Sequence, residues 1–339
     1  MSLEGIDLAR VSGWIEKHVS GVHPPLTAEL IAGGHSNLTY RLEDSRGRAL
    51  VLRRPPLAAV LESAHDMGRE HRIVSALGPT DVPVAPVHGL CRDPQVNGAP
   101  FYLMEFVPGV ILRDSREGAR VPQGDRRAIG FECIDVLARL HRIEPDRVGL
   151  GDLGRREAYI ARQLRRWSKQ FQASKLREIP EMEAAHRLLE ERMPEQVGCA
   201  IVHGDYRLGN MILEGTRIGA VLDWELCTLG DPLADLGYLL NSWLPPDELP
   251  PGPDVAPTAA GSFPTRDELL QHYAAATGRD VSKIAYYRAF QSWRGAAINE
   301  GVYHRYRMGA MGAREDLDLS RFEHATLRGA RAALELLER

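Results

Sequence analysis

The sequence predicts an α+β protein made of a small antiparallel β-sheet lobe and a larger, mainly helical lobe. Through the first hundred residues, short segments that mix β-branched and apolar residues are separated by turn-forming residues. Beyond residue 109, apolar residues instead recur every three to four positions, the period of an amphipathic helix. The length of 339 residues suits one large domain or two modest ones. We therefore expect lobes of residues 1–106 and 107–339, with a ligand cleft where they meet.

Five strands and one helix are expected in the small lobe. The strands are 27–31, 37–42, 49–54, 84–90 and 101–107. The first three are separated by Gly33-Gly34 and by the turn-forming residues 44–47. The helix is expected over 62–77, where Met67, Ile73 and Leu77 lie at helical spacing. The pattern indicates a small antiparallel sheet with one helix packed on it.

The large lobe is expected to be helical, with two short buried strands. Asp125 can cap the first helix, and further helices are expected over 159–175, over 181–193 and beyond Asp231. The two strands are expected over 199–202 and 218–222. Seven prolines between residues 244 and 264 predict a loop, because proline lacks the N–H that regular structure uses. Thr265, with Glu268 three residues later, fits a capping box that opens the next helix.

Composition and charge exclude several classes of protein. A net charge of −4 lacks the basic excess of proteins that coat nucleic acid. No uncharged apolar run approaches the ~18 residues of a membrane-spanning helix, and the N-terminus lacks the layout of a secretory signal. The four cysteines form no CxxC pair, so they predict neither a disulfide framework nor a zinc site. We expect a cytoplasmic protein whose partner is a small molecule, with no nucleic acid and no membrane; its oligomeric state is left open.

The most informative segment contains two apolar strands, each followed by polar residues that can take part in catalysis. Asp205 and Asn210 follow the strand 199–202, and Asp223 ends the strand 218–222. Phosphoryl transfer in kinase-type enzymes needs a carboxylate for the proton of the acceptor hydroxyl, and oxygen ligands for Mg²⁺. Asp205 is placed for the first task, Asn210 and Asp223 for the second. The 18-residue spacing from Asp205 to Asp223 leaves room for one hairpin, which brings both acids to one edge of the cleft.

Three motifs together resemble those of the aminoglycoside phosphotransferase family of kinase-like enzymes. They are HGDYRLGN at 203–210, VLDWEL at 221–226 and GDPLADL at 230–236. The resemblance covers roughly residues 28–238 and is closest to the branch associated with acyl-CoA dehydrogenase domains, although the dehydrogenase part is absent here. It implies a two-lobed protein-kinase-like fold and transfer of the γ-phosphate of ATP, or of GTP, to an alcohol group of a small molecule with the help of Mg²⁺.

The same resemblance implies that the small lobe holds the nucleotide phosphates. The loop 31–37 lies over them, with contacts from Gly33, Gly34, Ser36 and Asn37. There is no GxxxxGK[ST] segment, so a P-loop is not indicated.

Arg53 stands where the superfamily keeps a phosphate-binding lysine, and Glu70 is the helix carboxylate that matches it. Arginine stays charged and can bind phosphate, but its planar fork differs in reach from an ammonium group. The segment 101–107 resembles the connection between the lobes, where Met104, Glu105 and Val107 meet the adenine. There the Glu105 carbonyl and the Val107 N–H bond the adenine edge.

Other residues of the motifs have mixed interpretations. His203 resembles the histidine that braces the catalytic loop, and Asp231 and Asp235 are interpreted as structural, with Asp231 capping the helix that follows. Arg207, two residues after Asp205, either contacts the transferred phosphoryl group or faces solvent. We count it with Asp205 among the candidate catalytic residues.

Basic residues dominate two segments of the helical lobe and bear on the acceptor. The basic residues are Arg155, Arg156, Arg162, Arg165, Arg166, Lys169, Lys175 and Arg177, and then Arg288, Arg294, Arg305 and Arg307. An aminoglycoside is a polycation and needs a carboxylate-lined pocket, so this pattern favours an anionic hydroxylated acceptor, such as a hydroxyacyl-type metabolite. The alternative is that these basic helices are merely solvated faces.

Two other functions stay open. A non-catalytic nucleotide-binding pseudokinase is one, because Arg53 departs from the usual lysine; an aminoglycoside-modifying kinase is the other. A protein kinase is disfavoured, because the segment after Asp223 runs directly into Gly230-Asp231-Pro232 and leaves no long activation loop.

Overall fold

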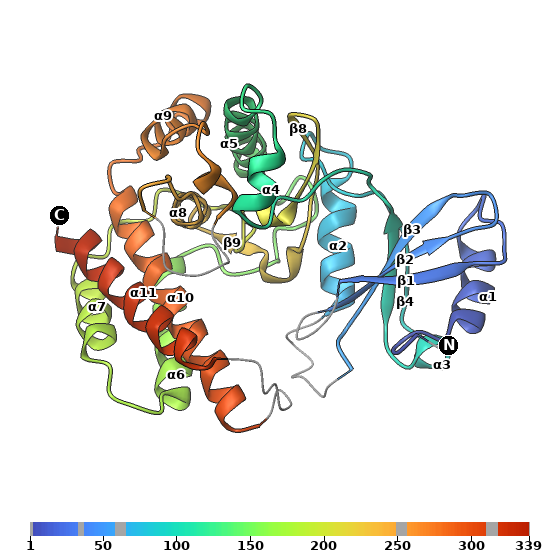
Figure 1. The fold of residues 1–339 in the computed structure, drawn as a ribbon, viewed down its shortest axis with the longest axis horizontal. Helices are drawn as coiled ribbons and strands as arrows, with labels where there is room; N and C mark the ends of the chain where they lie inside the picture. Colours follow the sequence, from blue (N-terminus) through green and yellow to red (C-terminus); the bar gives the residue numbers. More distant parts are fainter. Residues whose placement is uncertain (1–2, 33–36, 58–65, 249–255, 310–317, 339) are drawn as a thin grey trace. The chain divides into compact units, whose positions relative to one another are not determined.

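The computed structural model describes residues 3–32, 37–57, 66–248, 256–309 and 318–338 (Figure 1). The chain forms two compact units. Unit 1 comprises Met1–Ile111 together with Asn210–Cys227, and unit 2 comprises Leu112–Gly209 together with Thr228–Arg339. The assignment of nucleotide binding to residues 1–106 and of acceptor binding to residues 107–339 stays a prediction.

Unit 1 contains a five-stranded antiparallel sheet in the order β1-β2-β3-β5-β4. The strands are β1 Thr27–Ala32, β2 Leu38–Glu43, β3 Ala49–Arg54, β4 Val87–Cys91 and β5 Phe101–Glu105, and the helices are α1 Leu8–His18, α2 Met67–Leu77 and α3 Pro94–Asn97. The expected antiparallel sheet is confirmed. The part of the expected helix over 62–65 lies outside the described residues.

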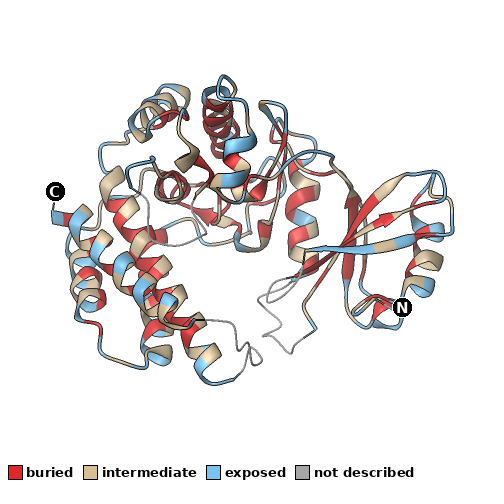
Figure 2. Ribbon diagram, viewed as in Figure 1, coloured by how far each residue is buried: buried red, intermediate tan, exposed pale blue. Residues whose placement is uncertain are grey.

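The central strands of the sheet are largely buried (Figure 2). Side chains of β3 alternate between two buried clusters, one on each face of the sheet. Leu50 and Leu52 pack in the cluster that contains Val11 and Ile15 of α1. Val51 instead packs with Met67 of α2, in a second cluster that also contains Tyr102 and Met104. Because side chains alternate along a strand, Arg53 shares the α2 side of the sheet with Val51.

Two helices of unit 1, α1 and the short α3, were not expected. The first hundred residues predict mainly strands, yet α1 precedes β1, and its N-terminus is capped by Asp7, whose carboxylate accepts the N–H of Arg10. The spacing of Val11 and Ile15, both fully buried, is the signal that could have indicated it.

The second part of unit 1 is the hairpin of β7 Met211–Glu214 and β8 Arg217–Val221. Backbone bonds join it to the N-terminal part: Val110 and Leu213 exchange two of them, and the Val221 N–H donates to the Pro83 carbonyl over 2.8 Å. Pro83 and Pro86 also explain why β4 begins at Val87 rather than at residue 84, since neither can donate a ladder bond.

Unit 2 is mainly helical, and its longest helix, α10, packs against α6, α7, α8 and α11. The helices are α4 Ser115–Arg120, α5 Arg126–Arg142, α6 Tyr159–Ser174, α7 Pro180–Glu191, α8 Leu233–Ser242, α9 Arg266–Thr277, α10 Ile284–Arg307 and α11 Ser320–Glu338, and β6 Ala200–Val202 pairs with β9 Thr228–Gly230. In the residues that the structure describes, no helix combines the length and the apolar character needed to cross a membrane.

Two expectations about helix starts have different outcomes. Thr265 and Glu268 form the expected capping box at the start of α9. Asp125 occupies the cap position of α5, as expected, but its side chain makes no hydrogen bond to the N–H groups of the first turn. The expected side-chain cap is therefore wrong. The reason is the backbone of Asp125, which is already helical at φ −88° and ψ −21° rather than extended. The proline-rich segment contains one 3₁₀ turn, Pro257–Ala260, and its residues 249–255 are not described.

Candidate active site

In unit 1, Asn210 and Asp223 lie at the same end of the β7–β8 hairpin. Met211 pairs with Val221 across the ladder, and the Leu222 N–H donates to the Asn210 carbonyl over 2.8 Å. The register therefore brings residues 210 and 223 to neighbouring positions at the hairpin's open end. Asn210 is buried, while the carboxylate of Asp223 is 27% exposed.

Asp223 has a left-handed backbone, with φ +65° and ψ +65°. This region is sparsely populated by residues other than glycine, and such conformations persist only where the surrounding structure enforces them. Here the strand β8 fixes one side, and the 3₁₀ turn Trp224–Leu226 fixes the other. Trp224 anchors the turn through its buried indole, whose N–H donates to the Val221 carbonyl over 3.0 Å.

Arg53 of β3 bridges two carboxylates of unit 1. Its Nε lies 3.1 Å from Glu70 Oε2 and 3.0 Å from Glu70 Oε1, and its Nη2 lies 2.5 Å from Asp223 Oδ1. The expected ion pair with Glu70 is therefore present, and the second contact, to Asp223, was not predicted. The Arg53 side chain is 12% exposed and that of Glu70 is 3% exposed, so solvent screens these charges weakly.

The electrostatics of this cluster follow from burial and from the paired charges. Burial raises the pKa of the Glu70 carboxyl, although Arg53 pulls it down. Burial disfavours the charged form of Arg53, but Glu70, Tyr102 and Asp223 outweigh it and raise the pKa of the guanidinium above its usual range. Tyr102 also hydrogen-bonds Glu70, which fixes this carboxylate from the sheet side.

The segment that follows Asp223 is held by two side chains of unit 1. Asn37 Nδ2 donates to Glu225 Oε2 over 3.4 Å, and Arg69 Nη2 donates to the Cys227 carbonyl over 2.5 Å. Asn37 was predicted as a phosphate contact, which stays a prediction. Gly33, Gly34 and Ser36 of the same predicted loop lie outside the described residues.

The predicted adenine contacts lie at the end of β5 and just beyond it. Met104 is buried on the α2 side of the sheet. Glu105 Oε2 lies 3.1 Å from Arg48 Nη2 and 2.5 Å from His88 Nε2, and these bonds help to lower the pKa of the carboxyl against the effect of burial. The Glu105 N–H is used within the fold, since it donates to the Pro86 carbonyl over 2.7 Å. The predicted use of the Glu105 carbonyl and of the Val107 N–H by adenine remains a prediction.

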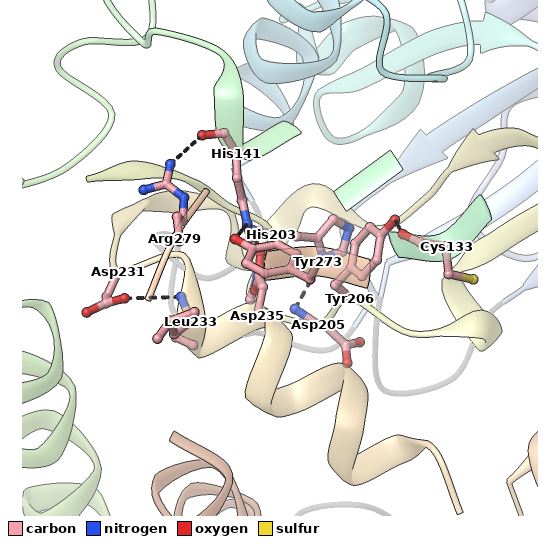
Figure 3. A network of polar contacts seen from close by, with 12 residues as sticks. Cys133, His141, His203, Asp205, Tyr206, Asp231, Leu233, Asp235, Tyr273 and Arg279 are labelled. Atoms are coloured by element: carbon pink, nitrogen blue, oxygen red, sulfur yellow. Dashed lines mark hydrogen bonds and ion pairs between the residues drawn. The ribbon is translucent and has the colours of Figure 1, made fainter. Parts of the chain in front are cut away.

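In unit 2, Asp235 of α8 braces the loop that carries Asp205 (Figure 3). Its carboxylate accepts the N–H groups of His203 over 2.6 Å and of Gly204 over 2.8 Å. His203 Nδ1 in turn accepts the N–H of Asp205 over 3.2 Å. Gly204 has φ +86°, a conformation that residues with a Cβ rarely adopt. The structural interpretation of His203 and Asp235 agrees with these contacts.

Buried partners extend this network away from the loop. His141 Nε2 lies 3.4 Å from Asp235 Oδ2, and His141 Nδ1 lies 2.7 Å from the hydroxyl of Tyr273 (Figure 3). Burial lowers the pKa of His141, so the ring is neutral near pH 7. Asp231 accepts the N–H of Leu233 over 3.1 Å at the start of α8, but Pro232 occupies the cap position, so Asp231 lies one residue before the cap.

The Asp205 carboxylate is contacted by Arg207 and Tyr238. Arg207 Nε lies 3.4 Å from Asp205 Oδ1, and the hydroxyl of Tyr238 hydrogen-bonds the same carboxylate. Burial is the main cause that raises the pKa of the Tyr238 phenol, and the negative charge of Asp205 raises it further. The phenol therefore stays protonated and can donate a hydrogen bond. Arg294 lies over the Tyr238 ring, 6.0 Å from its centroid, and donates to the Gly204 carbonyl over 3.0 Å.

Tyr238 and Arg294 are the residues that sequence reasoning missed or misassigned. Tyr238 stands just beyond the third motif, and no sequence pattern connects it with residue 205. Arg294 was counted with the basic residues that face the acceptor, but it is buried, with its guanidinium between the rings of Trp167 and Tyr238.

Several other basic residues are neutralised by neighbours. Arg156 pairs with Asp146 at 2.6 Å, Lys175 with Glu178 and Glu183, and Arg177 with Glu300 at 3.1 Å. Arg165, Arg166 and Lys169 remain exposed on α6. The expected basic surface is thus smaller than the sequence count indicates. Trp167, Trp293 and Tyr303 belong to the core rather than to a ligand surface.

A cavity of about 270 Å³ lies beside Tyr238, among α8, α10 and α11. Its lining is uncharged and includes Asn241, Ser292, Gly295 and Asn299. A Cβ built on Gly295 meets nothing within 4 Å. A larger cavity of about 830 Å³ surrounds Trp243, Phe263 and Arg266, and its described lining includes none of the predicted site residues.

The donor set at the hairpin end suits Mg²⁺. No cluster of three or more His, Cys, Asp or Glu side chains able to hold a metal ion occurs among the residues described. Mg²⁺ does not require one, because it is commonly held by one or two protein oxygens together with waters and substrate phosphates. The amide oxygen of Asn210 and the partly exposed carboxylate of Asp223 provide that kind of donor.

Known proteins similar to this chain include a phosphotransferase family, curated relatives and solved structures. The profile described as "Phosphotransferase enzyme family" matches residues 27–287. The mouse protein "Acyl-CoA dehydrogenase family member 10" is 39% identical over 308 residues, which are 87% of this chain and 28% of the mouse protein. The chain therefore spans less than a third of that relative's length.

Two solved structures show the extent of the fold likeness. A putative aminoglycoside phosphotransferase from Ralstonia eutropha is 33% identical with a TM-score of 0.81, and the match covers 98% of both chains. Aminoglycoside phosphotransferase APH(4)-Ia, solved as a ternary complex with ADP and hygromycin B, is 15% identical with a TM-score of 0.58, over 88% of this chain and 96% of the other. The second match shows a shared fold only. Together they confirm the expected kinase-like α+β fold.

Proposed function

Because the chain belongs to the phosphotransferase enzyme family, we propose that it is an ATP- and Mg²⁺-dependent O-phosphotransferase that acts on a hydroxyl group of a small molecule. The observation that carries the proposal is the cluster in unit 1, where Arg53 pairs with Glu70 and with Asp223, beside Asn210. A buried cation next to a partly exposed carboxylate supports binding of nucleotide phosphates and of a divalent metal.

Each candidate residue has a distinct role in this proposal. Asn210 and Asp223 hold Mg²⁺, and Arg53 contacts a phosphate of the nucleotide. The bound Mg²⁺ offsets phosphate charge during transfer. Asn37 contacts the phosphates, and Met104, Glu105 and Val107 contact the adenine. The ADP bound in the structurally similar aminoglycoside phosphotransferase APH(4)-Ia supports ATP as the donor.

The reaction assigns Asp205 the role of general base. The oxygen of the acceptor hydroxyl forms a bond to the γ-phosphorus, while the bond from that phosphorus to the bridging oxygen of ADP breaks. The hydroxyl proton passes to the Asp205 carboxylate. The bracing of the loop by Asp235 and His203 supports this role, since a base must be held in a fixed orientation. Arg207, next to Asp205, contacts the transferred phosphoryl group.

For the acceptor, we propose an anionic hydroxylated metabolite. The exposed Arg165, Arg166 and Lys169 of α6 support an anionic group on it. The uncharged cavity beside Tyr238 supports a neutral portion next to the reacting hydroxyl, because Tyr238 contacts both the cavity and Asp205. A hydroxyacyl-type compound combines these two properties.

The test is a screen of hydroxylated metabolites for stimulation of ADP release, followed by Asp205→Asn. We expect the stimulated rate to fall by about 10²–10⁴ when the general base is lost. Glu157→Gln, on an exposed residue of unit 2, is the control and keeps the wild-type rate. Equal rates in the wild-type protein and the Asp205→Asn variant would refute the role of Asp205. Stimulation by cationic amino sugars alone would refute the anionic acceptor but not the phosphotransferase.

One observation favours a second candidate, a nucleotide-binding protein without turnover. The Asp223 carboxylate that is proposed to bind Mg²⁺ is already paired with Arg53. If ADP binds with an ordinary affinity and no hydroxyl compound stimulates ATP turnover, this second function is the correct one.

A further inference from the structure

Arg53 makes a contact that a lysine could not reproduce in the same way. Its guanidinium carries donors at separated positions of a rigid plane, so that Nε bonds Glu70 while Nη2 bonds Asp223. Tyr102 fixes Glu70, and the strained turn fixes Asp223. Both carboxylates are therefore held in place, so a change of partners within this cluster requires a movement of the Arg53 side chain.

The bond to Asp223 competes directly with a metal ion. A guanidinium 2.5 Å from Asp223 Oδ1 supplies the positive charge that a bound divalent cation would otherwise supply. Two cations at one carboxylate repel each other, and this repulsion is strong where solvent screening is weak. The paired Arg53 therefore weakens the binding of a divalent cation at Asp223.

We propose that Arg53 occupies Asp223 as an internal counter-ion until nucleotide phosphates draw the guanidinium away, so that a divalent cation binds Asp223 only together with nucleotide. This inference rests on the proposed function, because it takes Asp223 as a metal ligand. A phosphate offers Nη2 a new anionic partner, while Nε keeps its bond to Glu70. The nucleotide thereby frees the carboxylate that its own metal ion needs.

The test measures the coupling between ADP and Mg²⁺ binding by calorimetry. ADP is titrated into the full chain in EDTA and in Mg²⁺, and the ratio of the two dissociation constants gives the coupling. We expect Arg53→Lys to reduce this ratio by about tenfold or more, the equivalent of one charge-assisted bond. Arg41→Lys, on the neighbouring strand β2, is the matched control, since Arg41 also pairs with a carboxylate, that of Glu43. It keeps the wild-type ratio.

A second measurement uses no nucleotide. Mn²⁺ binding to the chain alone, followed by electron paramagnetic resonance, is expected to be at least tenfold tighter for Arg53→Lys than for wild type. Adding Asp223→Asn to the lysine variant removes the gain. An unchanged coupling ratio together with unchanged Mn²⁺ binding would overturn the inference.

A further variant keeps the inference testable if Arg53→Lys fails to fold. Glu70→Gln removes the competing anion and leaves Arg53 more tightly bound to Asp223, so the coupling ratio is expected to rise rather than fall. A ratio equal to that of wild type contradicts the inference. Failure of the proposed function looks different: wild type then either binds ADP neither in EDTA nor in Mg²⁺, or binds ADP while no hydroxyl compound stimulates ATP turnover.

Discussion

Tyr238 links the base-bearing loop to the helical core of unit 2. Its hydroxyl bonds the Asp205 carboxylate, and its ring lies under the guanidinium of Arg294. Arg294 is itself held by the Trp167 ring at 5.4 Å and donates to the carbonyl of Gly204, next to Asp205. The loop is thus positioned from two sides, by Asp235 through its backbone and by Tyr238 through the carboxylate.

Tyr238→Phe removes only the hydroxyl and tests this positioning. A hydrogen bond to a charged group contributes about 1.5–3 kcal/mol, so we expect kcat for the stimulated reaction to fall by about 10- to 100-fold. The KM for ATP is expected to stay unchanged, because Tyr238 is not among the nucleotide contacts. Steady-state kinetics measure both constants. Tyr303→Phe, whose hydroxyl bonds Glu323 instead, is the control. A Tyr238→Phe enzyme with the wild-type kcat would show that the bond has no role in catalysis.

The residues of the site differ in how far the sequence predicts them. The pairing of Arg53 with Glu70 follows from the resemblance, because both positions match a known pair. The contact of Arg53 with Asp223 joins residues 170 positions apart and depends on the longer fork of arginine, so no local pattern indicates it. Arg294 shows the opposite error: its charge predicts exposure, whereas two aromatic rings and two carbonyl acceptors stabilise it in the interior.

At the scale of single elements, the start of α9 is defined by reciprocal side-chain bonds. The Thr265 hydroxyl accepts the N–H of Glu268, and the Glu268 carboxylate accepts the N–H of Thr265 over 2.8 Å. Arg127 of α5 also donates to Glu268, over 2.6 Å, which joins the two helices. Two N–H groups at the start of α9, those of Thr265 and Glu268, are therefore satisfied by side chains.

Thr265→Ala removes half of this capping box. We expect the free energy of unfolding to fall by about 1 kcal/mol, the usual cost of losing an N-cap hydroxyl. Urea unfolding followed by circular dichroism measures the change. Ser168→Ala, within α6, should show no loss, since alanine favours a helix interior. A Thr265→Ala protein as stable as wild type would mean that the bond from Arg127 alone maintains the helix start.

The elements also show where sequence patterns are sufficient. The capping box is a local signal of four residues, and it predicts α9 correctly. The strands of the small sheet follow from short β-branched and apolar segments between turns, but β4 begins three residues late, because Pro83 and Pro86 cannot donate ladder bonds. Their carbonyls are used instead by Val221 and Glu105, distant in sequence. Partners of that kind are invisible to a local pattern.

At the scale of the whole molecule, acid stability depends on carboxyl groups whose pKa is lowered in the folded state. The clearest is Glu268, where the bonds from Arg127 and Thr265 lower the pKa to about 2. Asp44, Glu105, Asp114 and Glu181 are also lowered. Such groups stabilise the fold above their unfolded pKa, and this stabilisation is lost as pH falls through the folded value. Burial raises the pKa of Glu70 and Asp231, so the contribution of these two groups to the stability of the fold changes with pH in the opposite direction.

We therefore expect the unfolding temperature to fall as pH decreases from about 4.5, the ordinary range of a glutamate, towards 2. Glu268→Gln cannot lose a charge on acidification, so its unfolding temperature should fall less steeply over this range. Scanning calorimetry at several pH values measures the slope. Glu16→Gln, on an exposed face of α1, is the control. Parallel slopes for wild type and Glu268→Gln would contradict the assignment.

The connectivity of unit 1 has a consequence during synthesis on the ribosome. Its first part ends at Ile111, but the hairpin that bonds Val110 and Pro83 comes from Asn210–Cys227. The nascent N-terminal sheet must therefore await another 116 residues, or roughly 6–23 s of translation at about 5–20 residues per second. During that interval the backbone groups of Pro83 and Val110 that later bond the hairpin are open to chaperones.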